Sequence, residues 1–283
     1  MIQVLYNEKA NNKRGFEGAK KIENYFEAKD VKYVDVLGAE NFDAILQDIP
    51  SEDKVVLAGG DGTLNYFVNR TSEEVIRSRK IDYLAAGTGN DFACEFGVKS
   101  GEMVEDIGKY LVNLPTVTVE GKTYKFINGV GYGIDGYCCE EGDRLREISD
   151  KPINYAGIAI KGILFKFKPA LATVTVDGEE NEYKHCWLSP VMNGKFFGGG
   201  MMPTPEQDRL GEPRKISTMV YHCPGLLKAL ITFPGIFKGE HVKATNVVKI
   251  ISGRKIEVAF SRPCACQIDG ETIKNVSKIS CEV

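Results

Sequence analysis

The sequence lacks the features that are typical of membrane-spanning, secreted or nucleic-acid-binding proteins. No uninterrupted apolar stretch approaches the ~20 residues of a membrane-spanning helix. The first residues show no basic segment followed by a long apolar run, so no signal peptide is predicted and a cytoplasmic location is expected. The formal net charge is -3 at pH 7, which predicts no general affinity for nucleic acid.

Motifs for zinc sites and structural disulfides are also missing. The 8 cysteines are scattered without a CxxC pair, and the 3 histidines show no HxxxH spacing. Free cysteine packs as a small hydrophobic side chain in a reducing compartment, and the scattered spacing favours this interpretation.

The first part of the chain alternates strand-like and helix-like segments. The whole chain has 283 residues, of which 43% are hydrophobic, and this length exceeds the usual ~100–200 residues of one domain. Alternation of strands and amphipathic helices predicts a parallel, Rossmann-like α/β sheet over residues 1–114. Its expected strands are Ile2–Tyr6, Lys32–Leu37, Lys54–Ala58 and Ile81–Ala86.

Beyond Pro115 the pattern changes to short segments that alternate in period two or carry β-branched residues. Turn sequences such as Asp177-Gly178 separate many of them, which is typical of an antiparallel β-sandwich. We therefore predict a second, β-rich domain over residues 115–283. Its expected strands are Thr116–Val119, Tyr124–Asn128, Thr173–Asp177, Tyr183–Leu188, Lys215–Tyr221, Val247–Ser252 and Lys255–Phe260.

Two glycine-rich loops follow neighbouring strands of the first domain. They are AGGDGT at Ala58–Thr63 and GTGNDFA at Gly87–Ala93. A strand, a glycine loop and a helix N-terminus together present backbone N–H groups that suit phosphate. Helix capping by Asp61, Asn90 and Asp91 is the structural alternative for each loop. Because parallel strands end at one edge of a sheet, the pair of loops predicts a nucleotide-phosphate site.

Neither loop matches the GxxxxGK[ST] or the GxGxxG nucleotide motif. Phosphate is therefore expected to be held by backbone amides, by Thr63 and Thr88, and by a metal ion, without a P-loop lysine.

GGDGT followed by GTGNDFA in the next strand–helix unit resembles the lipid-kinase family of soluble diacylglycerol kinases and sphingosine kinases. FINGVGYGIDG at Phe126–Gly136 and the sequence Asp269-Gly270-Glu271 are similar to two further motifs of that family. The resemblance spans roughly residues 1–271. It implies a two-domain lipid-kinase architecture, with an α/β nucleotide-binding catalytic domain over 1–114, a β-rich substrate-binding domain over 115–283, and ATP in a cleft between them.

The resemblance also implies a function and roles for single residues. The function is transfer of the γ-phosphate of ATP, with Mg²⁺, to a lipid hydroxyl, with diacylglycerol as the first choice. The general base corresponds to Asp269 in the bacterial diacylglycerol kinases and to Asp61 in the sphingosine kinases, and both assignments stay open. Asp135 is expected to contact the polar head of the substrate, and Asp208 to bind metal. Nucleotide-binding positions are Asn7, Gly59, Gly60, Asp61, Gly62, Thr63, Asn65, Thr88, Gly89, Asn90, Asp91 and Glu271.

The chain departs from the family pattern in places. The first loop reads Asn7-Glu8 where the family usually has Asn-Pro, and the segment Glu206–Arg209 keeps one aspartate of an acidic metal-binding turn. A second Asp-Gly-Glu copy stands at Asp177–Glu179. Asp-Gly is a common two-residue hairpin turn, so a purely structural role is an alternative for both copies.

Two other functions are also compatible with the sequence. An NAD kinase would share GGDGT, but the second loop has no Asn-Glu pair for a ribose acceptor. A nucleotide- or lipid-binding homologue that has lost catalysis is the other alternative. The apolar and basic stretches at 155–171 and 224–239 could lie at the inner surface of a membrane or could pack as core helices.

Overall fold

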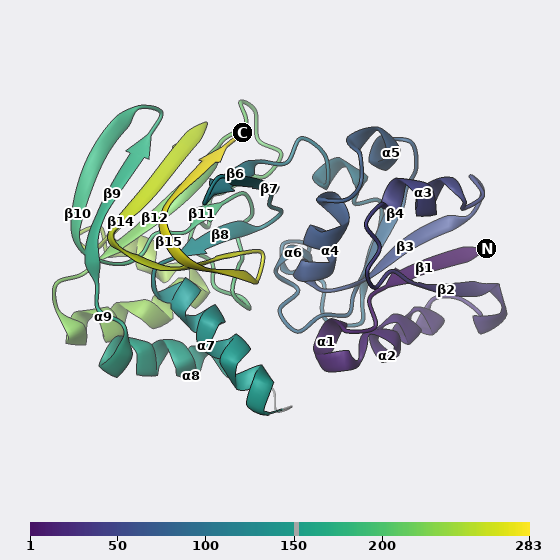
Figure 1. Cartoon of the computed structure of the whole chain (residues 1–283), viewed down its shortest axis with the longest axis horizontal. Helices are drawn as coiled ribbons and strands as arrows, with labels where there is room; N and C mark the ends of the chain where they lie inside the picture. Colours follow the sequence, from purple (N-terminus) through teal and green to yellow (C-terminus); the bar gives the residue numbers. More distant parts are fainter. Residues whose placement is uncertain (150–152) are drawn as a thin grey trace. The chain divides into compact units, whose positions relative to one another are not determined.

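The computed structural model describes residues 1–149 and 153–283 of the chain (Figure 1). The described chain divides into two compact units, Met1–Leu114 and Pro115–Val283. Each unit is built around a sheet of its own, so the two are described separately.

The first unit contains a five-stranded sheet in the order β2-β1-β3-β4-β5. The first four strands are parallel, and β5 runs antiparallel to β4 at one edge. The parallel α/β sheet predicted for the first domain is therefore confirmed. The strands are β1 (Ile2–Tyr6), β2 (Val31–Asp35), β3 (Lys54–Gly59), β4 (Ile81–Ala85) and β5 (Met103–Val104).

Short helices connect these strands. Asn41 and Ser72 accept backbone N–H groups as N-caps of α3 and α5, as their side chains favour. A buried apolar cluster that includes Val4, Val56 and Leu84 packs α2 and the following 3₁₀ turn onto the sheet. The helices are α1 (Ala10–Lys13), α2 (Gly15–Ala19), α3 (Phe42–Gln47), α4 (Asp61–Val68), α5 (Glu73–Arg77) and α6 (Asp91–Cys94), with 3₁₀ turns at Lys20–Asn24, Ala28–Asp30 and Gly108–Tyr110.

The second unit contains a ten-stranded antiparallel sheet that closes on itself through its longest strand, β14. One side of β14 pairs with β9 along Ile256–Phe260 and with β8 along Cys266–Ile268, while β15 lies along the other side. The predicted antiparallel second sheet is confirmed. The strands are β6 (Thr116–Val119), β7 (Lys122–Lys125), β8 (Gly129–Tyr132), β9 (Ala170–Val176), β10 (Glu179–Leu188), β11 (Val191–Met192), β12 (Ile216–His222), β13 (Val248–Gly253), β14 (Lys255–Ile268) and β15 (Glu271–Glu282).

Two apolar cores stabilise the second unit. One lies inside the closed sheet and includes Val130, Val174 and Ile256, and the other joins the helices to the sheet through residues such as Trp187 and Phe233. Among the described residues, no helix is both long enough and apolar enough to cross a membrane. The helices are α7 (Ile134–Ile148), α8 (Tyr155–Lys161), a π-helical turn (Gly162–Lys166), α9 (Leu226–Thr232) and 3₁₀ turns at Phe233–Lys238 and Glu240–Lys243.

Candidate functional site

The two glycine-rich loops lie at the same edge of the first sheet. Strands β3 and β4 are parallel with Gly59 opposite Ala85, so both strands end side by side. Strand β1 ends at Tyr6 beside Ala58 of β3, which brings Asn7 to this edge as well. The structure therefore brings together the loops that the sequence predicted to converge.

The two loops touch through their main chains at Gly60 and Gly87. A Cβ atom added to Gly87 would lie 2.3 Å from the Cα of Gly60, and one added to Gly60 would lie 2.9 Å from the Cα of Gly87. A side chain at Gly87 would therefore clash with the backbone of Gly60, and one of the two loops would have to move. Glycine at this position is therefore required by the close approach of the loops.

Asp61 joins the two loops by hydrogen bonds. It is the first residue of α4, and its two carboxylate oxygens accept the N–H groups of Asp91 and Phe92, each at 2.9 Å. These amides open helix α6, so Asp61 caps a helix that lies 30 residues further along the chain. Asp91 itself is buried.

Asn90 braces the second loop from within. It adopts a left-handed backbone with φ 51°, its side-chain oxygen accepts the N–H of Gly87 at 2.9 Å, and its amide donates to the carbonyl of Gly87 at 2.8 Å. The tip of this loop, Thr88 and Gly89, is exposed. A ligand that approaches this loop would meet the tip, because the side chain of Asn90 is engaged within the loop.

The other predicted nucleotide-binding residues of the first unit have local partners. The Asn7 side chain accepts the N–H of Lys9 at 2.9 Å, and the Asn65 side-chain oxygen accepts the Asn69 amide at 3.2 Å. Thr63 is buried and its side chain packs against Gly59. A Cβ atom added to Gly59 would lie 2.3 Å from the Oγ1 atom of Thr63. Thr63 therefore helps to set the shape of the first loop.

Asp269 lies in the hairpin turn between β14 and β15. Its backbone φ is 45° and that of Gly270 is 97°, as expected for an Asp-Gly turn. Its buried carboxylate accepts three consecutive backbone amides, those of Ile127 at 2.6 Å, Asn128 at 2.8 Å and Gly129 at 3.0 Å. The late Asp-Gly-Glu motif is thus bonded to the FINGVG motif by its aspartate.

The second Asp-Gly-Glu copy repeats this arrangement at an exposed turn. Asp177 (φ 50°) and Gly178 (φ 92°) connect β9 to β10, and the Asp177 carboxylate accepts the amides of Arg254 and Lys255, both at 2.8 Å. Both copies therefore close a hairpin and bind neighbouring backbone N–H groups. They differ in burial, since Asp269 is buried and Asp177 is exposed.

Asp135 lies in the first turn of α7 and is buried. Gln267 donates to its carboxylate at 2.9 Å and accepts the N–H of Gly270 at 2.6 Å, so one side chain links Asp135 to the turn that holds Asp269. Burial raises the pKa of the Asp135 carboxyl to about 6, and the hydrogen bond from Gln267 acts in the opposite direction. Asp135, Gln267 and Asp269 are called the carboxylate network below.

Two buried side chains that the sequence did not predict as site residues, Arg209 and Asn193, bind the segment whose amides hold Asp269. Buried Arg209 donates to the carbonyl of Ile127 at 3.0 Å and to the side chain of Asn128 at 3.1 Å. Asn193 donates to the same carbonyl at 2.8 Å. Asn128 lies within the motif that the sequence singled out, whereas no local pattern marks Arg209 or Asn193.

The predicted metal ligand Asp208 lies in the segment between β11 and β12. It is exposed, and its side chain accepts the N–H of Leu210 at 2.9 Å. The described parts of the chain hold no group of three or more His, Cys, Asp or Glu side chains that could bind a metal ion. The residues around Asp208 therefore do not fit a dedicated metal site. Glu271 is exposed at the start of β15.

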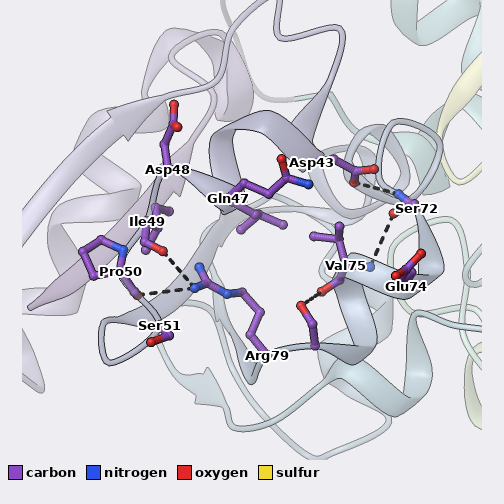
Figure 2. Close-up of a pocket in the computed structure, with 12 residues that line it drawn as sticks. Asp43, Gln47, Asp48, Ile49, Pro50, Ser51, Ser72, Glu74, Val75 and Arg79 are labelled. Carbon is purple, nitrogen blue, oxygen red and sulfur yellow. Dashed lines mark hydrogen bonds between the residues drawn. The ribbon is translucent and has the colours of Figure 1, made fainter.

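A hollow of about 670 Å³ lies at the opposite edge of the first sheet. Its wall includes Pro50 and Ser51, which precede β3, and Arg79, which precedes β4. Figure 2 shows Arg79 donating to the carbonyls of Ile49 and Pro50, at 3.0 and 3.3 Å. None of the predicted site residues lines this hollow, so it is not the predicted phosphate site.

Comparisons with known proteins agree with the motifs. The sequence model of the diacylglycerol kinase catalytic domain matches residues 1–119, and that of the YegS C-terminal NAD kinase beta sandwich-like domain matches residues 128–281. The protein YtlR of Bacillus subtilis (strain 168), named as a candidate lipid kinase, is 24% identical over 69% of this chain and 66% of its own length. A diacylglycerol kinase of Mycobacterium tuberculosis (strain ATCC 25618 / H37Rv) is 25% identical over 77% of this chain and 72% of its own length.

A solved structure shares the fold. The crystal structure of a diacylglycerol kinase from Bacillus anthracis str. Sterne superposes with a TM-score of 0.63 at 19% identity, over 99% of this chain and 93% of that one. The second family model alone covers more than half of the chain, and the two models follow one another in the order of the two units. The chain therefore belongs to the diacylglycerol kinase-like family of lipid kinases.

Proposed function

We propose that this protein transfers the γ-phosphate of ATP to a hydroxyl group of a lipid, and that diacylglycerol is its acceptor. The observation that carries the proposal is the main-chain contact between Gly60 and Gly87, which joins two glycine loops at the carboxyl ends of β3 and β4. The names of the Bacillus subtilis and Mycobacterium tuberculosis relatives support a lipid acceptor.

The glycine loops fit the phosphates of a nucleotide. Helix α4 begins directly after Gly60, and the first N–H groups of a helix have no partner within it and favour an anion. The exposed loop tip at Thr88 and Gly89 offers further backbone and hydroxyl groups. We assign the polyphosphate of ATP to this edge, with Mg²⁺ arriving on the phosphates and neutralising part of their charge.

We propose that Asp269 acts as the general base and accepts the proton of the acceptor hydroxyl. Three backbone amides fix the orientation of the Asp269 carboxylate. A carboxylate held in a fixed orientation is suited to accept the proton of a hydroxyl group that is bound beside it. Asp61 has its two oxygens on the amides of α6, so we propose that it positions the two loops.

Asp135 is proposed to contact the polar head of the acceptor. Its pKa of about 6 means that the carboxyl group exchanges its proton near neutral pH, where it can accept or donate a hydrogen bond to a hydroxyl. Gln267 connects it to the turn of Asp269, so the two carboxylates are held in a fixed relation.

The test is a transfer assay with ATP labelled in the γ-phosphate, Mg²⁺ and micellar acceptors. Diacylglycerol, sphingosine, other lipid alcohols and NAD are offered separately, and labelled phosphatidic acid is the expected product. Labelled NADP alone would identify an NAD kinase. Calorimetric binding of ATP–Mg²⁺ with no labelled product from any acceptor would identify a binding protein without catalysis. Either result would overturn the proposal.

A further inference from the structure

We propose that Arg209 is a positioning residue for Asp269, and that its guanidinium group supplies the positive charge at this turn in place of a bound divalent cation. Arg209 directly follows Asp208, the predicted metal ligand. The proposal has two consequences. The folded second unit should not depend on a divalent cation, and turnover should depend on the charge of Arg209. Only the second consequence rests on the proposed function.

Residues 206–210 direct alternate side chains to the surface and to the interior. Asp208 is exposed, whereas its neighbours Gln207 and Arg209 are only 5% and 4% exposed. Gln207 fixes this alternation, because its side-chain oxygen accepts the hydroxyl of Ser217 in β12 at 2.5 Å. The carboxylate of Asp208 is thereby held at the surface, and the guanidinium group of Arg209 is held among buried polar groups.

One peptide group connects Arg209 to Asp269. The guanidinium group donates to the carbonyl oxygen of Ile127 at 3.0 Å. The N–H of the same peptide group, which belongs to Asn128, donates to the Asp269 carboxylate at 2.8 Å. The negative end of the peptide dipole therefore faces a cation and its positive end faces an anion, and hydrogen bonds in such a chain strengthen one another. Through this peptide group, Arg209 acts on the orientation of the carboxylate.

Further donors surround the same segment. The Arg209 guanidinium also donates to the side-chain oxygen of Asn128 at 3.1 Å. Asn193 donates to the Ile127 carbonyl at 2.8 Å, and half-buried Arg214 donates to the side-chain oxygen of Asn193 at 3.2 Å. The oxygen atoms of this cluster thus accept N–H groups, and two of the donors are guanidinium groups.

The chemistry of this cluster suits a guanidinium group better than a divalent cation. Mg²⁺ and Ca²⁺ bind carboxylate and carbonyl oxygens. Here the oxygens of Ile127, Asn128 and Asn193 already accept hydrogen bonds, and the positive charges of Arg209 and Arg214 would repel a further cation. An arginine side chain stays protonated, so its charge cannot be removed by chelation.

The two acceptors match the planar fork of arginine. Its Nη1 atom reaches the carbonyl of Ile127 while its Nη2 atom reaches the side chain of Asn128. A lysine would keep the charge, but its single nitrogen is a point charge without the fork. Arg209→Lys should therefore give an effect between those of the unmodified protein and Arg209→Gln.

A purely structural role is the competing explanation for Arg209. In that case its replacement would lower the fraction of folded protein and leave the kcat of the folded protein unchanged. The positioning role instead predicts a lower kcat in protein that is fully folded. Measurements well below the unfolding temperature of each variant separate the two explanations.

The first experiment follows thermal unfolding of the full chain without nucleotide, in EDTA, in excess Mg²⁺ and in excess Ca²⁺. We expect the same Tm under all three conditions. Asp208→Asn should keep this Tm, because asparagine retains an oxygen for the N–H of Leu210. A saturable rise in Tm with either ion that Asp208→Asn abolishes would overturn the proposal.

Hydrogen exchange reports on the segment without an assay of activity. Arg209→Gln should speed the exchange of the amides of residues 127–129 by about tenfold, since their segment loses a charged donor. Arg254→Gln is the matched control, because Arg254 is an exposed arginine of the same unit outside the cluster. Arg209→Lys takes the place of Arg209→Gln if the latter fails to fold. Unchanged protection of residues 127–129 would overturn the proposal.

Turnover tests the positioning role. Arg209→Gln should lower kcat about tenfold and leave the Kd of ATP–Mg²⁺ unchanged, and Arg209→Lys should recover part of the loss. In the Asp269→Asn background the same substitution should have little further effect on kcat, because both residues act through one carboxylate. Multiplicative losses of kcat in the double variant would overturn the positioning role.

The outcomes for Arg209 and for the proposed function are distinguishable. If the unmodified protein transfers phosphate to none of the acceptors, the proposed function is wrong. The unfolding and exchange experiments then still decide whether Arg209 or a metal ion holds residues 127–129.

Discussion

At the scale of single residues, the carboxylates of this protein differ chiefly in what surrounds them. Asp61 and Asp269 bind backbone amides with their side-chain oxygens, whereas the carboxylate of Asp135 accepts a hydrogen bond from the side chain of Gln267. Amide donors favour a charged carboxylate, and burial disfavours it. These surroundings lead to two predictions at the residue scale.

Asp135→Asn should make stability less sensitive to pH. The pKa of Asp135 rises from 3.8 to about 6 on folding, so the folded protein binds its proton more tightly than the unfolded chain does. Stability from this group is therefore full below pH 4 and is lost as the pH rises to about 6. Above pH 6 the asparagine variant should be more stable than the unmodified protein by up to about 3 kcal/mol.

Urea unfolding of both proteins at pH 4 and pH 7 measures this difference. The variant keeps an oxygen that can accept the hydrogen bond from Gln267, so packing changes little. A stability difference that is the same at both pH values would contradict the prediction.

Asp269→Asn should lower kcat by about 10²–10⁴-fold, the usual contribution of a positioned general base. Asp177→Asn is a matched control, because Asp177 closes the same kind of hairpin and also binds backbone amides. Both variants lose a charge-assisted hydrogen bond, which costs about 1–3 kcal/mol when the site is buried.

Turnover with ATP–Mg²⁺ and a lipid acceptor separates the two roles, and circular dichroism verifies the fold. The control should keep its full kcat. If Asp269→Asn also keeps a full kcat, its carboxylate acts only on the hairpin and on residues 127–129.

At the scale of elements, the arrangement of β3, β4 and the helices that follow them decides the phosphate site. The loops meet at Gly60 and Gly87, and the carboxylate of Asp61 crosses from α4 to the start of α6. Parallel pairing alone places both strand ends at one edge, but the contact between the loops depends on glycine.

Gly87→Ala should weaken ATP binding and lower the free energy of unfolding by about 1–3 kcal/mol, because its Cβ would lie 2.3 Å from the Cα of Gly60. Gly108→Ala is the control in the same unit, since its Cβ would meet nothing closer than 3.8 Å. Isothermal titration with ATP–Mg²⁺ and denaturant unfolding measure both effects. Equal ATP affinity in the two variants would show that the contact does not shape the phosphate site.

At the scale of the whole molecule, each unit has apolar cores of its own. The cluster around Val56 and Leu84 belongs to the first unit, and the two clusters around Val130 and Trp187 belong to the second. A unit with its own core can in general fold alone.

We therefore expect residues 1–114 and 115–283, produced as separate fragments, each to unfold cooperatively. The first fragment should retain ATP–Mg²⁺ binding, because both glycine loops lie within it, and the second should show none. Circular dichroism and titration calorimetry test both expectations. ATP binding by the second fragment alone would contradict the assignment of the nucleotide to the glycine loops.

The sequence by itself determined the family and the class of each sheet. Strand-like runs that end in GGDGT and GTGNDFA identify neighbouring parallel strands, and parallel strands must end at a common edge, so the meeting of the two loops followed from local pattern. Period-two segments with Asp-Gly turns likewise predicted an antiparallel second sheet.

Only the tertiary structure decided what the carboxylates bind. The amides on Asp269 come from residues 140 to 142 positions earlier, and Arg209 reaches the same segment from 82 positions away. Hydrogen bonds between such remote segments leave no trace in local periodicity, because periodicity reports only which face of one element is buried. The sequence also did not predict that Phe165 and Leu227 are exposed. An apolar helix can have the same sequence whether its outer face is buried against other elements or exposed to solvent.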